Sequence, residues 1–252
     1  MSKKVFIQAG HTLSGAGTGA VGHINESVEN RKVVDSTVKW LKLGGATVYR
    51  EDVDKSNDYL NAQTNVANKY NTDVAVQIHF NSSSSPNAHG TETYYKTSSG
   101  KVYSDRVNKK LSTLFYNRGS KTHSKNLHWL RATKAPAILI EVCFVSSKAD
   151  TDLYKANVDK IGKLIAEGIL GKTILEPKQE DKRIYAICVC AVTGSENADK
   201  KIAELKKQGF KDTYKILRLF IWLNTWSVLR KALHASQVHS VLIERWFTDV
   251  KL

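Results

Sequence analysis

The fold is indicated most clearly by residues 73–81, DVAVQIHFN, a short apolar run with a histidine near its end. Its length and its content of Val and Ile predict a buried β-strand. Outward from it, residues 5–11 (VFIQAGH) predict a strand that leads into a histidine, and residues 137–142 (AILIEV) predict one that contains a glutamate. The chemically active residues of these segments are His11, His79 and Glu141. Since parallel strands gather their carboxyl ends at one edge of a sheet, we expect these side chains to converge.

Segments with helical periodicity separate the predicted strands. Apolar residues recur at helical spacing from Glu26 to Leu43, and Gly44-Gly45 would end that helix. Further helices are predicted over residues 59–70, 101–116 and 151–170, and further strands over residues 46–49 and 91–95. This alternation predicts an α/β fold with a mainly parallel, twisted sheet flanked by helices.

Composition divides the chain into three parts. Residues 1–171 carry the alternation of strands and helices and are expected to form the main domain. Residues 172–182, KTILEPKQEDK, are polar, contain a proline and predict a linker. Residues 183–252 predict a small α+β appendage, with a strand at 183–192 and a helix at 196–208 before an irregular, tryptophan-containing tail.

The formal net charge of the 252 residues is +14, and both parts of the chain contribute to it. The 23 basic and 15 acidic residues of 1–171 give +8, and the 15 basic and 9 acidic residues of 172–252 give +6. Such a field favours a polyanionic partner, which could be a nucleic acid, an acidic membrane or an anionic cell wall. No basic stripe is interleaved with aromatic residues, so a nucleic-acid partner is not expected.

No targeting segment is expected from the sequence. No window approaches the roughly 18 to 20 apolar residues that a membrane span requires, so no span is expected. The first residues, MSKKVFIQAGH, lead into a strand without an apolar signal segment. Cys143, Cys188 and Cys190 are an odd number without a disulfide framework. These features predict a protein that is made in the cytoplasm without a signal peptide.

The residue types at the predicted sheet edge suit metal-assisted hydrolysis. His11, Glu26 and His79 provide two imidazoles and a carboxylate, a zinc ligand set that leaves one position open. Bound zinc lowers the pKa of its water to about 7 and polarises a carbonyl. Glu141 would take the proton of that water and pass it to a leaving amine. Because the ligands form no compact motif such as His-Glu-x-x-His, spacing alone leaves open that both histidines are ordinary loop residues.

Other polar residues near these segments have two interpretations. His23 precedes Glu26 by three residues and is a rival ligand, whereas Glu29 is expected on a solvated helix face. The residues that would either contact a substrate or serve loop structure are Asn81, His128 and Arg131. Cys143 is expected to pack in the core, and His89 and His123 are expected to lie on the surface.

Four blocks of the chain, each weak alone, occur in a specific order. The first two are Gly10-His11 before a Gly/Ala-rich loop, and Asn25-Glu26 at the start of a helix. The third is QIHFN at 77–81. The fourth comprises NRGSK at 117–121, LHWLR at 127–131 and APAILIEVCFV at 135–145. Together they resemble the zinc-dependent N-acetylmuramoyl-L-alanine amidases of the amidase 3 type, over about residues 4–170.

The resemblance implies that His11, Glu26 and His79 bind Zn²⁺ and that Glu141 is catalytic. It also implies the bond that is cleaved, the amide between the lactyl group of N-acetylmuramic acid and L-alanine in peptidoglycan. The family usually begins its first motif with Asp-Pro-Gly-His, whereas this chain has Gln8-Ala9-Gly10-His11. Gln8 is therefore expected to remove an acidic partner of His11.

Residues 182–216 resemble the first β-α half of a SPOR-type repeat, a module that binds peptidoglycan, and a generic β-α appendage is the alternative. The second half of such a repeat is not recognisable in residues 217–252. The expected partners are peptidoglycan and anionic wall polymers such as teichoic acids, bound by a monomer. The expected setting is a phage endolysin released through a holin, or an autolysin that acts after mother-cell lysis. The alternative function is a non-catalytic protein that binds cell wall or another polyanion on an amidase-like scaffold.

Overall fold

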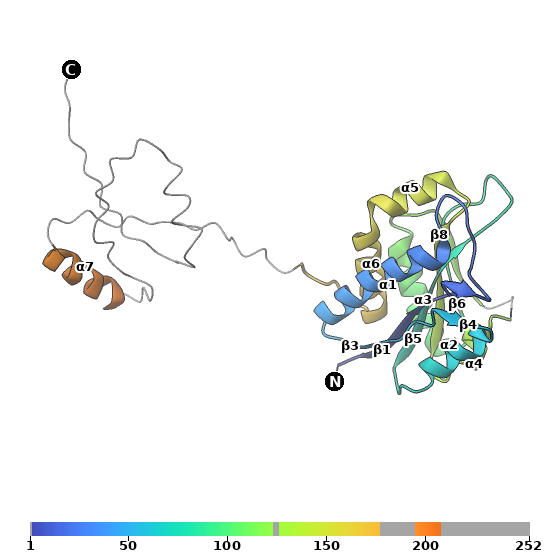
Figure 1. The fold of residues 1–252 in the computed structure, drawn as a ribbon, viewed down its shortest axis with the longest axis horizontal. Coiled ribbons are helices and arrows are strands. Elements are labelled where there is room, and N and C mark those ends of the chain that lie inside the picture. Colours follow the sequence, from blue (N-terminus) through green and yellow to red (C-terminus); the bar gives the residue numbers. More distant parts are fainter. Residues whose placement is uncertain (1, 123–125, 177–194, 208–252) are drawn as a thin grey trace, which may run out of the picture. The chain divides into compact units, whose positions relative to one another are not determined.

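The computed structural model describes residues 2–122, 126–176 and 195–207 (Figure 1). The chain divides into two compact units, Met1–Glu176 and Pro177–Leu252, which are described separately. In the second unit the described element is α7, Ser195–Lys207, which starts and ends one residue before the predicted bounds. The predicted strand at 183–192, most of the predicted linker and the tail lie outside the described residues.

The first unit is built on a six-stranded sheet in the order β3-β1-β5-β8-β6-β7. Neighbouring strands are parallel except for β8 and β6, so the predicted mainly parallel sheet is confirmed. A separate short parallel pair joins β2 to β4. The strands are β1 (Lys4–Ala9), β2 (Ser14–Gly15), β3 (Thr47–Arg50), β4 (Lys55–Ser56), β5 (Val74–Asn81), β6 (Thr91–Tyr95), β7 (Asn117–Thr122) and β8 (Ala137–Phe144).

Helices cover both faces of this sheet (Figure 1). The larger apolar core lies between the sheet and α1, α3 and α6, and the smaller one lies between the sheet and α2 and α4. None of the helices in the described part of the chain is both long and apolar enough to cross a membrane. The helices of this unit are α1 (Glu26–Leu43), α2 (Tyr59–Ala67), α3 (Ser98–Leu111), α4 (His128–Ala132), α5 (Lys148–Ala156) and α6 (Val158–Leu170).

Three predicted helices of this unit have different bounds in the structure. The helix expected over 59–70 is α2, which ends earlier, at Ala67. The helix expected over 101–116 is α3, which begins earlier because the Thr97 hydroxyl accepts a hydrogen bond from the Gly100 amide and caps it. The prediction of a single helix over 151–170 is wrong. The segment forms two helices, α5 and α6, separated at Asn157, whose backbone leaves the helical region (φ −134°, ψ 22°).

The sequence does not predict β7 or α4. The β7 segment, NRGSKT, has no large apolar residue because it forms the edge of the sheet, where its side chains are half-buried or exposed. The α4 helix has only five residues, too few for a periodic pattern. Neither element has a sequence pattern that would predict it, and both depend on contacts with neighbouring elements.

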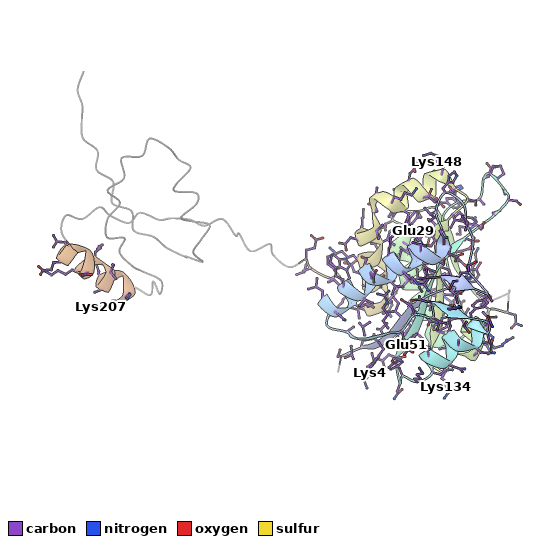
Figure 2. The ribbon with its side chains drawn as sticks, viewed as in Figure 1. Lys4, Glu29, Glu51, Lys134, Lys148 and Lys207 are labelled. Atoms are coloured by element: carbon purple, nitrogen blue, oxygen red, sulfur yellow. The ribbon has the colours of Figure 1, made fainter. Side chains whose placement is uncertain are left out.

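The charged side chains of the first unit are spread over its surface. Lys4, Lys134 and Lys148 are exposed and lie at separate places on the unit (Figure 2). Several lysines pair with carboxylates on their own helix, as Lys101 does with Asp105. Within the described residues, the basic charge is therefore distributed and partly neutralised locally.

One face of the sheet changes from apolar to polar toward the carboxyl ends of the parallel strands. Side chains alternate between faces along a strand, so Val76 and Ile78 of β5 enter the larger core. Ala75 enters the smaller core, and Gln77 and His79 continue along that same face. The residues that share this face, here called the polar face, are Gln8 of β1, Gln77, His79 and Asn81 of β5, Glu141 of β8 and Glu92 of β6. The predicted chemistry lies at this end of the sheet.

Candidate metal centre

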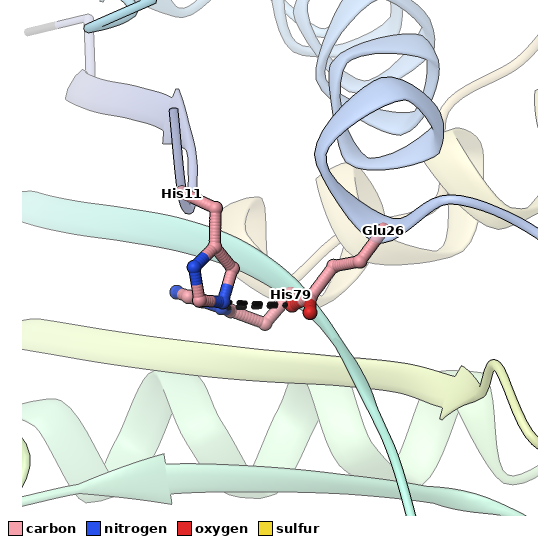
Figure 3. A group of neighbouring side chains, drawn as sticks. All are labelled: His11, Glu26 and His79. Atoms are coloured by element: carbon pink, nitrogen blue, oxygen red, sulfur yellow. Dashed lines mark hydrogen bonds and ion pairs between the residues drawn. The ribbon is translucent and has the colours of Figure 1, made fainter. Parts of the chain in front are cut away.

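The structure brings His11, Glu26 and His79 together (Figure 3). His11 lies two residues after the end of β1. Glu26 is the first residue of α1, and His79 lies near the end of β5. One ligand atom from each of the three lies within 4.8 Å of the others. The Glu26 Oε1 atom is 3.2 Å from His11 Nε2 and 3.1 Å from His79 Nδ1. The predicted convergence at the sheet edge is therefore present.

The position before His11 requires glycine for a steric reason. A Cβ atom on Gly10 would lie 2.2 Å from the imidazole of His79, so only glycine leaves room for that ring. His11 adopts a left-handed backbone conformation (φ 61°), which is unfavourable for a residue with a side chain. Its carbonyl oxygen accepts hydrogen bonds from Arg31 Nη2 (3.2 Å) and Gln63 Nε2 (3.4 Å). These contacts hold the turn that aims the imidazole at Glu26.

A chain of amide groups determines the tautomer of His79. The Gln63 side chain donates to the His11 carbonyl, so its Oε1 atom accepts from Gln77 Nε2 (3.0 Å). The Gln77 Oε1 atom therefore faces His79 Nε2 (3.0 Å), which must be the protonated nitrogen. The lone pair of His79 Nδ1 then points at the Glu26 carboxylate.

His11 obtains its outer partner from the backbone. Its Nδ1 atom donates to the carbonyl of Gly17 (2.9 Å), which leaves Nε2 facing Glu26. The hydrogen bond that the structure gives the Gln8 side chain is to Gln63 and not to His11. The Gln8 side chain is buried and its Nε2 atom donates to the Gln63 carbonyl at 3.5 Å. The Gly17 carbonyl therefore orients the His11 imidazole.

The carboxylate of Glu26 is held at the amino end of α1, where the helix dipole favours negative charge. Its oxygens accept hydrogen bonds from the amides of Ala20 (2.8 Å) and Phe80 (3.0 Å). Burial opposes ionisation of Glu26, but the neighbouring imidazoles of His11 and His79 outweigh it and lower the pKa of the carboxyl far below its usual range. Glu26 is therefore a carboxylate at neutral pH.

The pKa values of the two imidazoles are shifted in opposite directions. Burial lowers the pKa of His79 below its usual value, more than the charge of Glu26 raises it. Burial also opposes the charged form of His11, but the hydrogen bond and charge of Glu26 outweigh it and raise the pKa of that imidazole. Neutral His79 and ionised Glu26 present a lone pair and a negative charge to the same point.

This donor set fits a zinc ion. Both imidazoles have their outer nitrogen hydrogen-bonded to an oxygen, so that the inner nitrogen is free to ligate a metal. Two lone-pair nitrogens and a carboxylate oxygen that face one another need a cation or a shared proton between them. Zinc accepts three such protein ligands and keeps a further position open in catalytic sites.

Glu141 lies beside His79 in the sheet. The register of the strands pairs Glu141 with His79 on β5 and with Glu92 on β6. Neighbouring strands are about 4.8 Å apart, so these three residues form a row across the polar face. Glu141 is half-buried, and its backbone carbonyl accepts a hydrogen bond from the Thr91 hydroxyl (3.1 Å). A carboxylate next to the candidate ligands is what a proton carrier requires.

His23 and Glu29 do not belong to this cluster. The exposed His23 donates through its backbone amide to the Val145 carbonyl (2.9 Å). Glu29 accepts hydrogen bonds from the Tyr154 hydroxyl (2.8 Å) and from Lys32 Nζ (2.7 Å). The expectation of a solvated position for Glu29 is wrong because Tyr154 covers part of it.

The remaining candidates have mainly structural contacts. His128 lies between Thr64 (3.4 Å) and Arg131 (3.3 Å), which ties α4 to α2. Cys143 is buried, and burial raises the pKa of its thiol well above the usual value, so its predicted packing role is confirmed. His89 is exposed against the ring of Tyr116, and His123 lies outside the described residues.

Sequence reasoning missed Glu92. Its side chain is only 3% exposed, and it accepts hydrogen bonds from the side chains of Asn81, Tyr94, Arg118 and Lys121. The strand at 91–95 was predicted, but nothing in TETYY tells which strand lies beside it. Its antiparallel pairing with β8 is what places Glu92 next to Glu141.

Comparison with known proteins assigns a family to the first unit. The profile of the family described as N-acetylmuramoyl-L-alanine amidase matches residues 5–171. A protein of Clostridium perfringens without an assigned role is 38% identical over 184 residues, which are 69% of this chain and 53% of the relative. An endolysin of Bacillus phage SPP1 is 30% identical over 72% of this chain and 73% of its own. The chain spans about half the length of the first curated relatives that it matches.

Solved structures agree with this assignment. The catalytic domain of the CD27L endolysin, which targets Clostridia difficile, is 31% identical with a TM-score of 0.63 and aligns with 69% of this chain and 99% of that domain. The catalytic domain of CwlV, an N-acetylmuramoyl-L-alanine amidase of Bacillus (Paenibacillus) polymyxa var. colistinus, is 30% identical with a TM-score of 0.60. It aligns with 67% of this chain and 97% of that domain. The similarity lies in a catalytic-domain fold.

Proposed function

This chain belongs to the N-acetylmuramoyl-L-alanine amidase family, and on that basis we propose that it hydrolyses the amide between the lactyl group of N-acetylmuramic acid and L-alanine in peptidoglycan, with Zn²⁺ held by His11, Glu26 and His79. The observation that carries the proposal is the convergence of these three donors within 4.8 Å, next to Glu141 in the strand ladder. The relatives named as amidases and endolysins support the same activity.

The residues of the site have separate tasks in this reaction. When bound, zinc supplies an acidified water and polarises the scissile carbonyl. The ionised Glu26 and the oriented lone pairs of His11 and His79 hold the metal. Glu141 accepts the proton of the attacking water and returns it to the leaving nitrogen, because a glutamate beside the reacting atoms can serve as base and then as acid.

The wider role that fits this chemistry is lysis of the bacterial wall, as a phage endolysin or an autolysin. Support comes from the phage endolysin among the relatives and from the net charge of +14, which suits anionic wall polymers. Residues 183–252 would add wall binding through their SPOR-like sequence, and the enzyme would act as a monomer. Binding of the full chain to purified wall, compared with a chain ending at Glu176, measures that contribution.

Incubation of the purified protein with peptidoglycan is expected to release new amino termini on L-alanine. A chelator should stop the reaction, and added zinc should restore it. Labelling of free amino groups followed by mass spectrometry of the products measures the outcome. New reducing sugars without new alanine termini would mean a glycosidase instead, and wall binding without any product would favour the non-catalytic alternative.

The amide chain behind His79 yields a prediction about metal affinity. Gln77→Met keeps the side-chain length but removes the oxygen that accepts the His79 proton, so zinc affinity is expected to fall about 10- to 100-fold. Gln8→Met is the matched control, since Gln8 is equally buried but contacts neither histidine through its side chain. Competition with a chromophoric chelator gives both affinities. Equal affinity in the two variants would show that the amide chain does not orient the ligand.

A further inference from the structure

The buried carboxylate of Glu92 gathers two cations on the polar face. Arg118 Nε donates to Glu92 Oε2 at 3.1 Å, and Lys121 Nζ forms an ion pair with the same oxygen. On the other oxygen, Asn81 Nδ2 (2.6 Å) and the Tyr94 hydroxyl (2.9 Å) donate. We call Arg118 and Lys121 the cation pair. Glu92 is the buried carboxylate that holds both of them.

The cation pair lies beside the candidate catalytic residue. Asn81 is on β5 and Glu92 is on β6, so their hydrogen bond passes over β8, which lies between these strands. Asn81 is in register with Phe144 of β8, three residues after Glu141. The Arg118 guanidinium is 4.9 Å from the centre of the Phe144 ring. Both observations place these charges over the carboxyl end of β8, next to Glu141.

The cation pair has an excess of positive charge that reaches solvent. Burial opposes the ionisation of Glu92, but Lys121, Tyr94 and Arg118 outweigh it and lower the pKa of its carboxyl. One carboxylate thus faces two cations, and a net charge of about +1 remains. The Glu92 side chain is 3% exposed, whereas those of Arg118 and Lys121 are 32% and 39% exposed. The buried anion fixes both cations without covering them.

Hydrogen-bond donors also remain for a ligand. A guanidinium has five N–H groups and an ammonium has three. Within the described residues, Arg118 donates to Glu92 and to the His89 carbonyl (3.4 Å), and Lys121 donates to Glu92. The ligand that suits fixed, half-exposed donors of this kind is a carboxylate.

We propose that Arg118 and Lys121 form a subsite for a carboxylate on the peptide that follows the cleaved amide. The inference rests on the proposed function, which puts that amide at His79 and Glu141. From β5 to β6 the polar face extends over two strand spacings, about 10 Å, and an extended peptide advances about 3.3 Å per residue. The cation pair is therefore within reach of the second or third residue of the peptide. Glu92 is a positioning residue that keeps both cations in place before substrate arrives.

The test uses two N-acetylmuramoyl peptides that differ only at their second residue, with a free carboxylate in one and its amide in the other. The full-length protein is expected to prefer the acidic peptide about tenfold or more in KM, with similar kcat, because a hydrogen bond to a charged group is stronger than a neutral one. Arg118→Gln and Lys121→Gln should each remove most of this preference by raising KM for the acidic peptide. Lys134→Gln removes an exposed charge at the opposite end of β8 and should change nothing (Figure 2).

Titration of the free peptides, without the muramoyl group, separates this inference from the proposed function. Binding of the acidic peptide that depends on Arg118 supports the subsite even if neither muramoyl peptide is hydrolysed. Hydrolysis of both muramoyl peptides at equal KM, unchanged by the two substitutions, would overturn the subsite and keep the amidase. Arg118→Lys retains the charge and should retain part of the preference, so a folding defect in Arg118→Gln does not leave the question undecided.

Discussion

Glu141→Gln is expected to reduce peptidoglycan hydrolysis by about 10²- to 10⁴-fold, which is the usual contribution of a positioned acid or base. The amide has the shape of the carboxylate but cannot take a proton from water at neutral pH. Glu141 lies in the ladder beside His79 and is not one of the three convergent donors. The variant should therefore still bind about one zinc per chain. Metal analysis of the purified variant and its rate of alanine amino-terminus release measure both effects.

Glu29→Gln is the matched control for this substitution. It removes a carboxylate that bonds to Tyr154 and Lys32 rather than to the cluster, so hydrolysis and zinc content should both remain near those of the parent protein. Loss of zinc from Glu141→Gln would make Glu141 a ligand and require another base. Full activity of that variant would move the proton transfer to a different residue.

Glu26→Gln is expected to abolish both metal binding and hydrolysis. The substitution replaces the one anionic donor, so zinc affinity should fall by more than the 10- to 100-fold that loss of an outer partner costs. The two amides of Ala20 and Phe80 bond to different oxygens of Glu26, so the single oxygen of glutamine keeps one of these contacts and loses the other. Any loss of stability from this is separated from loss of zinc by comparing each protein with itself, with and without the metal. Zinc at 100 times its dissociation constant stabilises a protein that binds it by about 2.7 kcal/mol. Thermal unfolding with and without zinc should show this gain in the parent protein and little of it in the variant.

Glu29→Gln serves as the control here as well, because it lies one turn further along the same helix. A zinc-dependent rise in its unfolding temperature, absent from Glu26→Gln, would locate the metal at the amino end of α1. Unchanged zinc binding in Glu26→Gln would instead require another ligand, and His23 would then become the residue to replace.

The parts of this fold that the sequence predicts are those with strong local patterns. Residues 73–81 are buried along most of their length, and α1 has the predicted bounds because apolar periodicity and Gly44-Gly45 agree. The histidines could be placed together because the carboxyl ends of parallel strands meet. Glu26 could be placed beside them because it opens the helix that follows.

The parts that the sequence does not predict depend on contacts between distant segments. Glu92 gains its position from an antiparallel neighbour and its charge partners from the edge strand β7. The amide chain of Gln63 and Gln77 joins a helix to a strand, and no spacing rule connects them. At Asn157 a single residue has a non-helical backbone conformation, although the sequence around it has a helical pattern. Each of these features requires knowledge of which elements are neighbours.

The row formed by His79, Glu141 and Glu92 also determines where insertions and deletions can accumulate during evolution. Side-chain direction along a strand has a period of two, so one residue added to β8 before Glu141 would turn this carboxylate into the apolar core. The loop at residues 82–90 joins β5 to β6 without supplying a ligand atom to the cluster. Lineages of this protein should therefore diverge in the length of that loop while β5 and β8 keep their residue count.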